Sequence, residues 1–191
     1  NQVHGDTVRV CTAADAGSGL ERKPDYEADG LITDVPGLCL VVFSADCGIL
    51  VLHDPEAGCV GAVHAGWRGC AAGIVEKTVR EMVCLLGARP ERILAALGPC
   101  IGKCCFETDS DVPEAMRTSA LGAEAEPYLE QRGEKWHVDL AGLNRQWLLR
   151  AGVAPDHIDV CGLCTACRPD LFWSHRKMGE ARGVQAAVIS L

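Results

Sequence analysis

Short apolar runs alternate with turn-forming residues along the first half of the chain. Three of these runs have the length of buried strands: Leu38–Phe43, Gly48–Leu52 and Cys59–Val63. Turn signals separate them, among them Asp54-Pro55 and Gly58. Because the runs are nearly continuous in apolar residues, we expect all three strands to lie centrally in a sheet.

A helical pattern follows the third strand. Apolar residues recur at the helical period in Ala71–Leu86, and Gly87 is suited to end that helix. The helix comes directly after the motif V-H-A-G-W-R-G. Its first turn could therefore present amide N–H groups, and the positive end of its dipole, to an anion near His64.

The second half continues the alternation of strands and helices. Asp139 can cap a helix over Leu140–Ala151, and Gly152 can end it. The segment Cys161–Arg182 is a long loop, and loops of that length are usually functional, so we expect a lid or a pocket wall there. Three further strands complete the pattern: Ile93–Leu97, His157–Val160 and Val184–Leu191.

Length and composition indicate one compact domain over residues 1–191. Hydrophobic residues make up 48% of the chain, which is enough for a sizeable core. No apolar run approaches the ~18 residues that a membrane span needs. The formal net charge of −8 disfavours a nucleic-acid partner, because such proteins usually present a basic surface to phosphates. We therefore expect a small-molecule substrate, and neither nucleic acid nor membrane as a partner.

The 12 cysteines do not predict a disulfide framework. Such frameworks are typical of small domains without a core, so we expect mostly reduced thiols and a cytoplasmic protein. Cys161, Cys164 and Cys167 have the C-x2-C-x2-C spacing of metal ligands, but the run lacks a fourth ligand. We interpret the pair Cys104-Cys105 as packing residues.

Three short motifs each supply one metal-binding side chain. They are Q-V-H-G with His4, S-A-D-C with Cys47, and V-H-A-G-W-R-G with His64. Cys47 and His64 follow predicted strands, where an α/β sheet places its chemistry. Two imidazoles and one thiolate predict a catalytic zinc site, because three protein ligands leave the fourth tetrahedral position open for water or substrate. Copper is the second choice of ion, since the 6 histidines are too few and too scattered for several coppers.

These motifs belong to an ordered series that spans the chain and resembles the family once called multicopper polyphenol oxidases or laccase-domain proteins. The further motifs of the series are A-D-G-L-I-T, L-G-P-C-I-G, C-F-E, W-H-V-D-L and F-W-S-H-R. The resemblance implies an α/β (α+β) fold of mixed β-sheets sandwiched by helices. It also implies that the N-terminal stretch of the family is lacking here, since the chain begins at Asn1 without Met.

The resemblance further implies a function. Members of the family are described as zinc-dependent purine nucleoside phosphorylases with adenosine deaminase activity, and one bacterial branch as a peptidoglycan editing factor. We therefore expect a zinc enzyme that acts on adenosine, inosine and related nucleosides, with phosphate as cosubstrate. The sequence leaves the oligomeric state open.

Three side chains beside the predicted ligands have candidate roles. Asp46 could orient a ligand imidazole or act as a general base, although an Asp after a strand is also a common turn residue. Arg68 could bind phosphate or ribose through its bidentate guanidinium, the alternative being a surface ion pair. Trp67 could stack on a purine, although an aromatic beside a strand end is more often part of the core.

The long loop adds further candidates for substrate binding. Arg176 and Arg182 bring positive charge to an otherwise acidic chain, which suits an anionic cosubstrate such as phosphate. His175 and Glu107 could assist proton transfer, or could be structural polar groups. Phe172 is a second aromatic that could stack on a purine.

Other classes of function remain open at the level of sequence. Cys47 could be a nucleophile with His64 as its base, which suits hydrolysis of a peptidoglycan precursor and needs no metal. The chain could also be a metal-stabilised interaction module, but an open three-ligand set is unlike a structural site. Polyphenol oxidation, the historical activity, is the last alternative.

Overall fold

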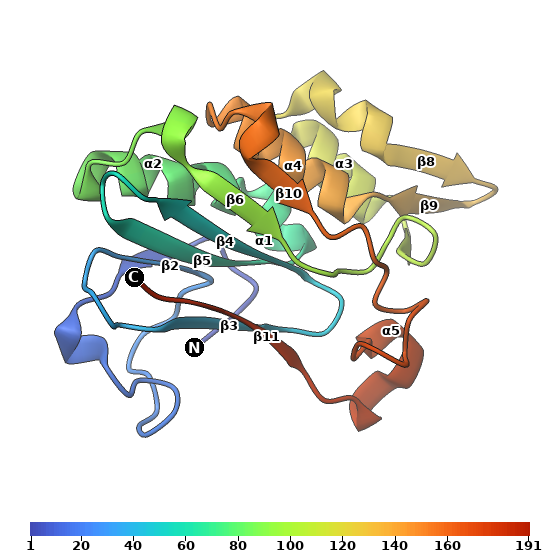
Figure 1. Cartoon of the computed structure of the whole chain (residues 1–191). Helices are drawn as coiled ribbons and strands as arrows, with labels where there is room; N and C mark the ends of the chain where they lie inside the picture. The colour runs from blue at the N-terminus through green and yellow to red at the C-terminus, as the bar shows by residue number, and fades with distance from the viewer.

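A six-stranded mixed sheet forms the centre of the protein (Figure 1). The structure is a computed structural model that describes residues 1–191. The strand order is β1-β2-β5-β4-β6-β10. The outer pairs β1/β2 and β6/β10 are parallel, and the inner pairs are antiparallel. The strands are β1 (Val8–Val10), β2 (Gly30–Thr33), β4 (Gly48–Asp54), β5 (Cys59–Ala65), β6 (Leu94–Leu97) and β10 (Ile158–Val160).

Helices cover one face of this sheet (Figure 1). They are α1 (Trp67–Ala71), α2 (Ile74–Leu86), α3 (Asp111–Thr118) and α4 (Leu140–Arg150). The larger hydrophobic core lies between them and the sheet, with Trp147 of α4 and Met82 of α2 almost completely buried in it. A short three-stranded antiparallel sheet continues this layer at the far end, in the order β7 (Glu107–Thr108), β9 (Lys135–Val138) and β8 (Leu129–Arg132).

An antiparallel ribbon covers part of the other face. It consists of β3 (Leu40–Ser44) and β11 (Gln185–Ile189), and a second, smaller core separates it from the six-stranded sheet. Within β5, Val60 and Ala62 pack toward the ribbon, whereas Val63 packs toward the helices. Side chains of a strand alternate between its two faces, and both faces of β5 are buried, so every position of this strand except His64 is apolar or glycine.

The predicted strands agree with the observed ones in all six cases, with ends that differ by a few residues. The predicted central position is wrong for Leu38–Phe43, because this run forms β3 in the separate ribbon. Its residues alternate in burial, and Phe43 is 41% exposed. A strand that buries one face suits the ribbon, whereas β4 and β5 are buried on both faces.

The predicted helix over Ala71–Leu86 is interrupted by a glycine. Gly73 has a φ of 75° and divides the segment into α1 and α2, and a Cβ at this position would lie 3.2 Å from the Trp147 ring. The predicted helix end at Gly87 is confirmed, with a φ of 71°. The predicted cap of α4 is confirmed as well, because the Asp139 carboxylate accepts a hydrogen bond of 2.9 Å from the Gly142 amide.

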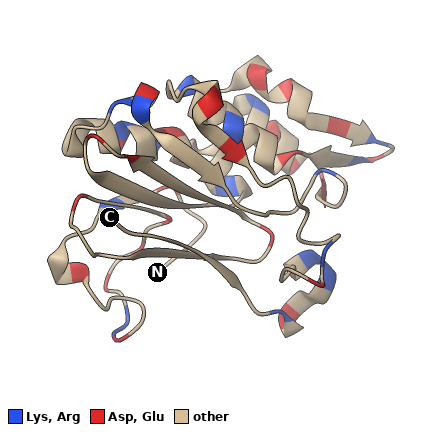
Figure 2. Cartoon of the chain, viewed as in Figure 1, with Lys and Arg blue, Asp and Glu red and all other residues tan.

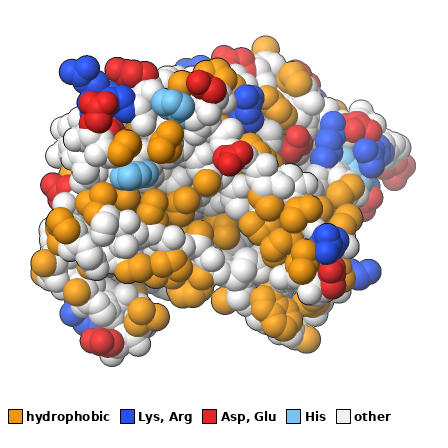
Figure 3. Space-filling model, in the orientation of Figure 1, with side chains coloured by type: hydrophobic (Ala, Val, Ile, Leu, Met, Phe, Trp, Pro, Cys, Tyr) orange, Lys and Arg blue, Asp and Glu red, His pale blue; other side chains and the backbone are white.

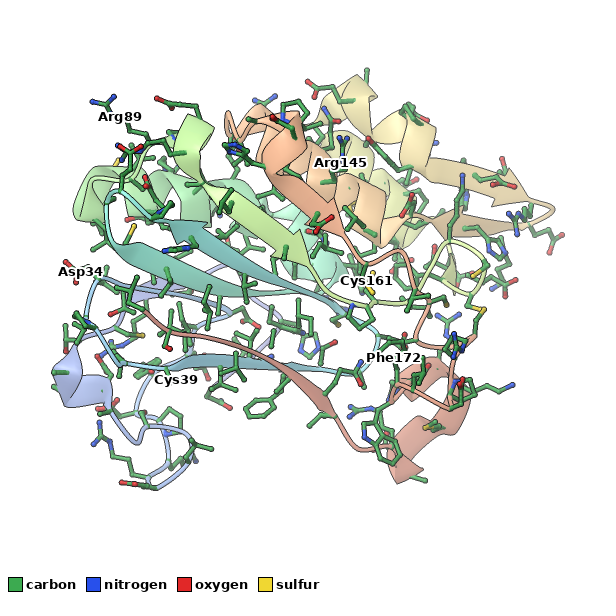
Figure 4. The ribbon with its side chains drawn as sticks, viewed as in Figure 1. Asp34, Cys39, Arg89, Arg145, Cys161 and Phe172 are labelled. Carbon is green, nitrogen blue, oxygen red and sulfur yellow. The ribbon has the colours of Figure 1, made fainter.

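The predicted loop Cys161–Arg182 contains one short helix, α5 (His175–Met178). Figure 4 labels Cys161 where β10 ends and Phe172 shortly before α5. The remaining helical segments are short 3-10 helices at Ala13–Asp15, Pro90–Arg92, Gly122–Tyr128, Pro155–His157 and Gly179–Ala181.

Charged residues lie mainly on the helices and loops, and the strands of the central sheet and the ribbon carry few of them (Figure 2). Hydrophobic side chains are visible over the ribbon, where Phe43, Val184 and Val188 are exposed (Figure 3). None of the helices has the length and apolar character needed to cross a membrane.

Candidate active site

The side chains of His4, Cys47 and His64 meet at one end of the central sheet. Their ligand atoms lie within 4.8 Å of one another. Cys47 precedes β4 and His64 lies near the end of β5, and these two strands are adjacent, with Ile49 opposite His64. His4 comes from the segment before β1, and its ring meets that of His64 edge to face, with 4.8 Å between the ring centres.

A buried carboxylate, Asp29, organises this cluster. Its side chain accepts a hydrogen bond of 2.7 Å from Nδ1 of His64. It also accepts hydrogen bonds from the backbone amides of Val3, His4 and Gly5, at 3.2, 3.1 and 2.8 Å. One carboxylate therefore fixes both the His64 ring and the backbone that carries His4.

The tautomer of His64 follows from this contact. In the neutral imidazole Nδ1 carries the proton that is donated to Asp29, so the lone pair lies on Nε2. A histidine that binds a metal through one nitrogen generally donates from the other to a carboxylate or carbonyl. His64 thus has the environment of a metal ligand.

The electrostatics of the cluster favour a thiolate. Burial opposes ionisation of Cys47, but its contacts with His4 and His64 outweigh burial and lower the pKa of the thiol to about 7. Burial also disfavours the charged form of His64, yet hydrogen bonds to Asp29 and Cys47 raise the pKa of this imidazole to about 9. A cation can therefore be balanced here by the Cys47 sulfur and the Asp29 carboxylate.

The Q-V-H-G segment is held at both of its ends, at Gly5 by Asp29 and at Gln2 by β3. The Gln2 amide pairs with β3, donating to the Phe43 carbonyl at 2.8 Å and accepting from the Phe43 amide at 2.7 Å. His4 itself has a φ of 59°, in the left-handed region that residues other than glycine rarely adopt. Such backbone conformations persist where the surroundings fix them, and they concentrate at functional sites.

Glycines let the three motifs approach one another. A Cβ at Gly66 would lie 3.1 Å from the His4 ring and 3.2 Å from the Cys47 sulfur. At Gly69 a Cβ would lie 2.7 Å from the carbonyl oxygen of Gly5. A larger residue at Gly66 would crowd His4 and Cys47, and one at Gly69 would displace the backbone of Gly5.

Asp46 lies beside the cluster but faces the long loop. Its carboxylate accepts a hydrogen bond of 2.6 Å from the Thr165 hydroxyl and one of 2.7 Å from the backbone amide of Arg176. The carboxylate that bonds to the His64 imidazole is therefore Asp29 and not Asp46, whereas the predicted role of Asp46 as a general base stays a prediction. Asp46 has a φ of 89°, and its two hydrogen bonds connect the long loop to the residue next to Cys47.

The arginines of the loop differ in what they contact. Arg176 donates from its guanidinium to the carbonyls of Cys105 and Glu107, at 3.2 and 2.9 Å. Arg182 donates from Nε to Nδ1 of the exposed His175 at 3.1 Å, and it lines the cavity next to the cluster. Of these charged groups, Arg182 is the one that both faces the cavity and lacks a carboxylate partner.

The structure places Arg68 and Trp67 at the start of α1, on the helix side of the sheet. The Arg68 guanidinium stacks on the Trp67 ring at 4.2 Å from its centre and forms no ion pair with a carboxylate. Trp67 is half-buried and packs against the larger core. Neither residue lines the cavity, so the predicted contacts of both with substrate stay predictions.

A cavity of about 660 Å³ opens from the cluster along the ribbon. Its walls are formed by the start of the chain, by the loop that contains Leu20 and Tyr26, and by β3. His4, Cys47 and His64 lie in its lining, together with Arg182. The volume is in the range of small-molecule sites, which combine apolar walls with a few polar groups.

The whole chain, residues 1–191, matches the family model described as multi-copper polyphenol oxidoreductase laccase. The chain belongs to this family. The family resemblance expected from the motifs is thereby confirmed.

Relatives in the family have names that describe reactions of nucleosides. The chain is 44% identical, over 191 residues, to the purine nucleoside phosphorylase of Deinococcus radiodurans, covering 100% of this chain and 68% of the relative. It is 37% identical to the purine nucleoside phosphorylase YlmD of Geobacillus stearothermophilus, covering 98% and 69%. It is also 38% identical to adenosine deaminase RL5 of an unknown prokaryotic organism, covering 81% and 59%.

Solved structures of family members have the same fold. The hypothetical protein YfiH of Bacillus licheniformis superposes with a TM-score of 0.95 at 36% identity, covering 100% of this chain and 72% of that one. YlmD of Geobacillus stearothermophilus superposes with a TM-score of 0.87 at 35% identity, covering 99% and 71%. The predicted α/β fold of mixed sheets with helices is confirmed, and the chain spans roughly 70% of these family members' length.

Sequence reasoning missed two residues of the candidate site. Asp29 stands in the motif A-D-G-L-I-T, directly before β2, but the motif alone gave it no role. The available signal was an acid directly before an apolar run, because an acid that is buried at such a position needs hydrogen-bond partners. Thr165 carried no signal at all, because its partner Asp46 is 119 residues away.

Proposed function

We propose that this chain is a zinc-dependent purine nucleoside phosphorylase that acts on adenosine, inosine and related nucleosides, and that it also deaminates adenosine. The observation that carries the proposal is the convergence of His4, Cys47 and His64 on the wall of a substrate-sized cavity. The names of the relatives support the choice of nucleosides as substrates.

Zinc fits the donor set. Two imidazole nitrogens and one thiolate are typical zinc ligands, and three protein ligands leave one position for substrate. His64 offers Nε2 because Nδ1 is bonded to Asp29, and Cys47 ionises near neutral pH. When bound, the ion supplies Lewis-acid polarisation of a substrate oxygen or nitrogen.

The residues around the cluster perform the other tasks that the reaction needs. Asp29 keeps His64 in one tautomer and one orientation. The apolar wall of the cavity, from β3 and the loop with Leu20 and Tyr26, excludes water from the base and ribose. In this proposal Arg182 binds phosphate, because the Arg176 guanidinium already donates to two backbone carbonyls.

The proposal is tested by assaying the purified protein for three reactions: phosphorolysis of inosine, phosphorolysis of adenosine and deamination of adenosine. Inosine and adenosine with phosphate should yield hypoxanthine, adenine and ribose 1-phosphate, and adenosine alone should yield inosine. His4→Ala should lose bound zinc and all three activities together, because two remaining ligands hold zinc poorly. His53→Ala changes a histidine of β4 outside the ligand cluster and serves as the control.

Metal analysis separates zinc from copper. The proposal requires zinc in the active preparation and loss of turnover on chelation, with recovery when zinc is returned. Full turnover in a preparation verified as metal-free would overturn it. Activity that returns with copper and not with zinc, with a phenol as substrate, would favour oxidation of polyphenols instead.

A second candidate function is supported by the contacts from Cys47 to His64 and from His64 to Asp29, which resemble those of a catalytic triad. The thiol, with its pKa lowered to about 7, contacts His64, and His64 donates to a buried carboxylate. This is the arrangement of a cysteine nucleophile with an oriented base, which would suit hydrolysis of a peptidoglycan precursor. A covalent intermediate on Cys47, trapped during turnover of such a precursor without metal, would establish this function in place of the first.

A further inference from the structure

A second group of sulfur atoms lies outside the candidate active site. The Sγ atoms of Cys104, Cys105, Cys164 and Cys167 are within 4.8 Å of one another. Cys167 is 3.6 Å from Cys104 and 3.4 Å from Cys105, measured between sulfurs. The sequence offered the run C-x2-C-x2-C without a fourth ligand, whereas the structure leaves Cys161 out and brings in the adjacent pair Cys104-Cys105.

The spacing of the four sulfurs corresponds to a single tetrahedral ion. Zinc–sulfur bonds of ~2.3 Å at tetrahedral angles place the sulfurs about 3.8 Å apart. A disulfide would need a separation of about 2.05 Å, and all four cysteines are free thiols in the structure. In an iron–sulfur cluster of four irons each thiolate binds a different iron, so its sulfurs stand farther apart than sulfurs on one ion.

We propose that Cys104, Cys105, Cys164 and Cys167 bind a second, structural zinc ion. Four protein ligands close the coordination sphere, which is the arrangement of structural zinc sites rather than catalytic ones. The proposal is independent of the proposed function, because none of these residues belongs to the His4, Cys47 and His64 cluster.

The backbone around the four thiols is arranged to receive such an ion. The Gly102 amide donates a hydrogen bond to the Cys164 sulfur at 3.2 Å, and N–H donors of this kind stabilise a thiolate. A Cβ at Gly102 would lie 3.1 Å from Cβ of Cys164 and 3.3 Å from the Cys104 sulfur, so this approach requires glycine. Arg176 donates to the Cys105 carbonyl at 3.2 Å and adds positive charge beside a centre with an excess of thiolates.

The ion would join two segments that are far apart in sequence. The segment after β6 and the segment after β10 run side by side here (Figure 1), paired through a bridge between Cys100 and Cys164. The Thr165 amide donates to the Cys100 carbonyl at 3.1 Å, while its hydroxyl donates to Asp46. Because Asp46 precedes Cys47, the four-thiolate site fixes the long loop next to the candidate active site.

The stoichiometry of bound zinc tests the proposal in the purified, reduced protein. Replacing two thiolates, in Cys104→Ser/Cys167→Ser, should remove one zinc ion per chain relative to the wild type, whatever the first site holds. The matched control Cys84→Ser/Cys161→Ser changes two exposed cysteines outside the cluster and should remove none. Equal zinc content in all three proteins would overturn the proposal.

A second measurement does not depend on the folding of a cysteine variant. His4→Ala/His64→Ala disables the first site, and this protein should still hold one zinc ion. Titration with a mercurial reagent should release that ion as four thiols react, and cobalt in its place should give the strong sulfur charge-transfer absorption of four thiolates. No zinc in this protein, iron in place of zinc, or disulfides among these four cysteines in its peptide map would each refute a structural zinc site.

Discussion

Asp29 and His64 form a hydrogen bond of 2.7 Å between a buried carboxylate and Nδ1 of a buried imidazole, across 35 residues of sequence. The same carboxylate binds three consecutive backbone amides of the His4 segment. In the folded protein burial disfavours the charged form of Asp29, but these bonds outweigh it and lower the pKa of the carboxyl. The geometry of two candidate ligands, His4 and His64, thus depends on a side chain that is not itself a candidate ligand.

Replacing Asp29 should weaken metal binding without removing a ligand. We expect Asp29→Asn to lower zinc affinity by about 10- to 100-fold, the usual loss when the hydrogen-bond partner of a ligand histidine is changed. The measurement is competition for zinc against a chelator of known affinity. Asp25→Asn changes an exposed acid of the same segment and should leave the affinity unchanged. Unchanged affinity in Asp29→Asn would mean that His64 is not a ligand.

The contact between Thr165 and Asp46 should control the long loop. Thr165→Val removes the hydroxyl that donates to Asp46 and leaves a buried carboxylate oxygen without this partner. We expect a loss of about 1–3 kcal/mol in the free energy of unfolding, measured with urea. We also expect faster proteolysis within the loop 161–182, measured by mass spectrometry of the fragments. Thr7→Val, at an exposed threonine, should show neither effect.

Asp54 should make the stability of the fold depend on pH. It is fully buried and accepts hydrogen bonds from the amides of Glu56, Ala57 and Arg89 and from the Arg92 guanidinium. Burial works against its ionisation, but these donors prevail, and the pKa of Asp54 is lowered. A lowered pKa in the folded state adds stability above the unfolded pKa, and this stability is lost as the pH falls through the folded value.

The test compares the wild type with Asp54→Asn by urea unfolding. At pH 7 the variant should be less stable by about 1.5–3 kcal/mol, because hydrogen bonds to a charged group are lost. The difference should shrink as the pH falls below about 4, the ordinary pKa of an Asp carboxyl in the unfolded chain, and toward the lower pKa of Asp54 in the folded state. Asp34→Asn, at an exposed position, should match the wild type throughout. A pH-independent difference would show that the charge of Asp54 contributes nothing.

Arg182 should determine the use of phosphate if the proposed reaction occurs. Arg182→Gln removes the cation that lines the cavity, so we expect KM for phosphate to rise about tenfold or more, in line with the strength of a charge-assisted bond. Deamination of adenosine, which uses no phosphate, should change less. Arg80→Gln, at an exposed site on α2, is the control for the loss of one positive charge. A rise of equal size in both reactions would assign Arg182 to binding of the nucleoside instead.

The sequence by itself determined the local structure and the kinds of ligand. Short, nearly continuous apolar runs predict β4 and β5, and Asp139, Gly87 and Gly152 predict helix ends, because these signals act over a few neighbouring residues. The same local pattern could not predict that β3 lies outside the central sheet, because a run of apolar residues does not indicate which strand it will pair with. The ligand types were readable because histidine and cysteine are the side chains that zinc prefers.

Only the tertiary structure decided which groups meet. Asp29 and Asp46 both lie next to strands in the sequence, but the register of β2, β4 and β5 brings Asp29 to His64 and turns Asp46 toward Thr165. Cys104 and Cys167 are 63 residues apart, and they meet because the loops after β6 and β10 are paired. The register of paired strands decides which side chains that are distant in sequence come into contact, and local propensities carry no information about that pairing.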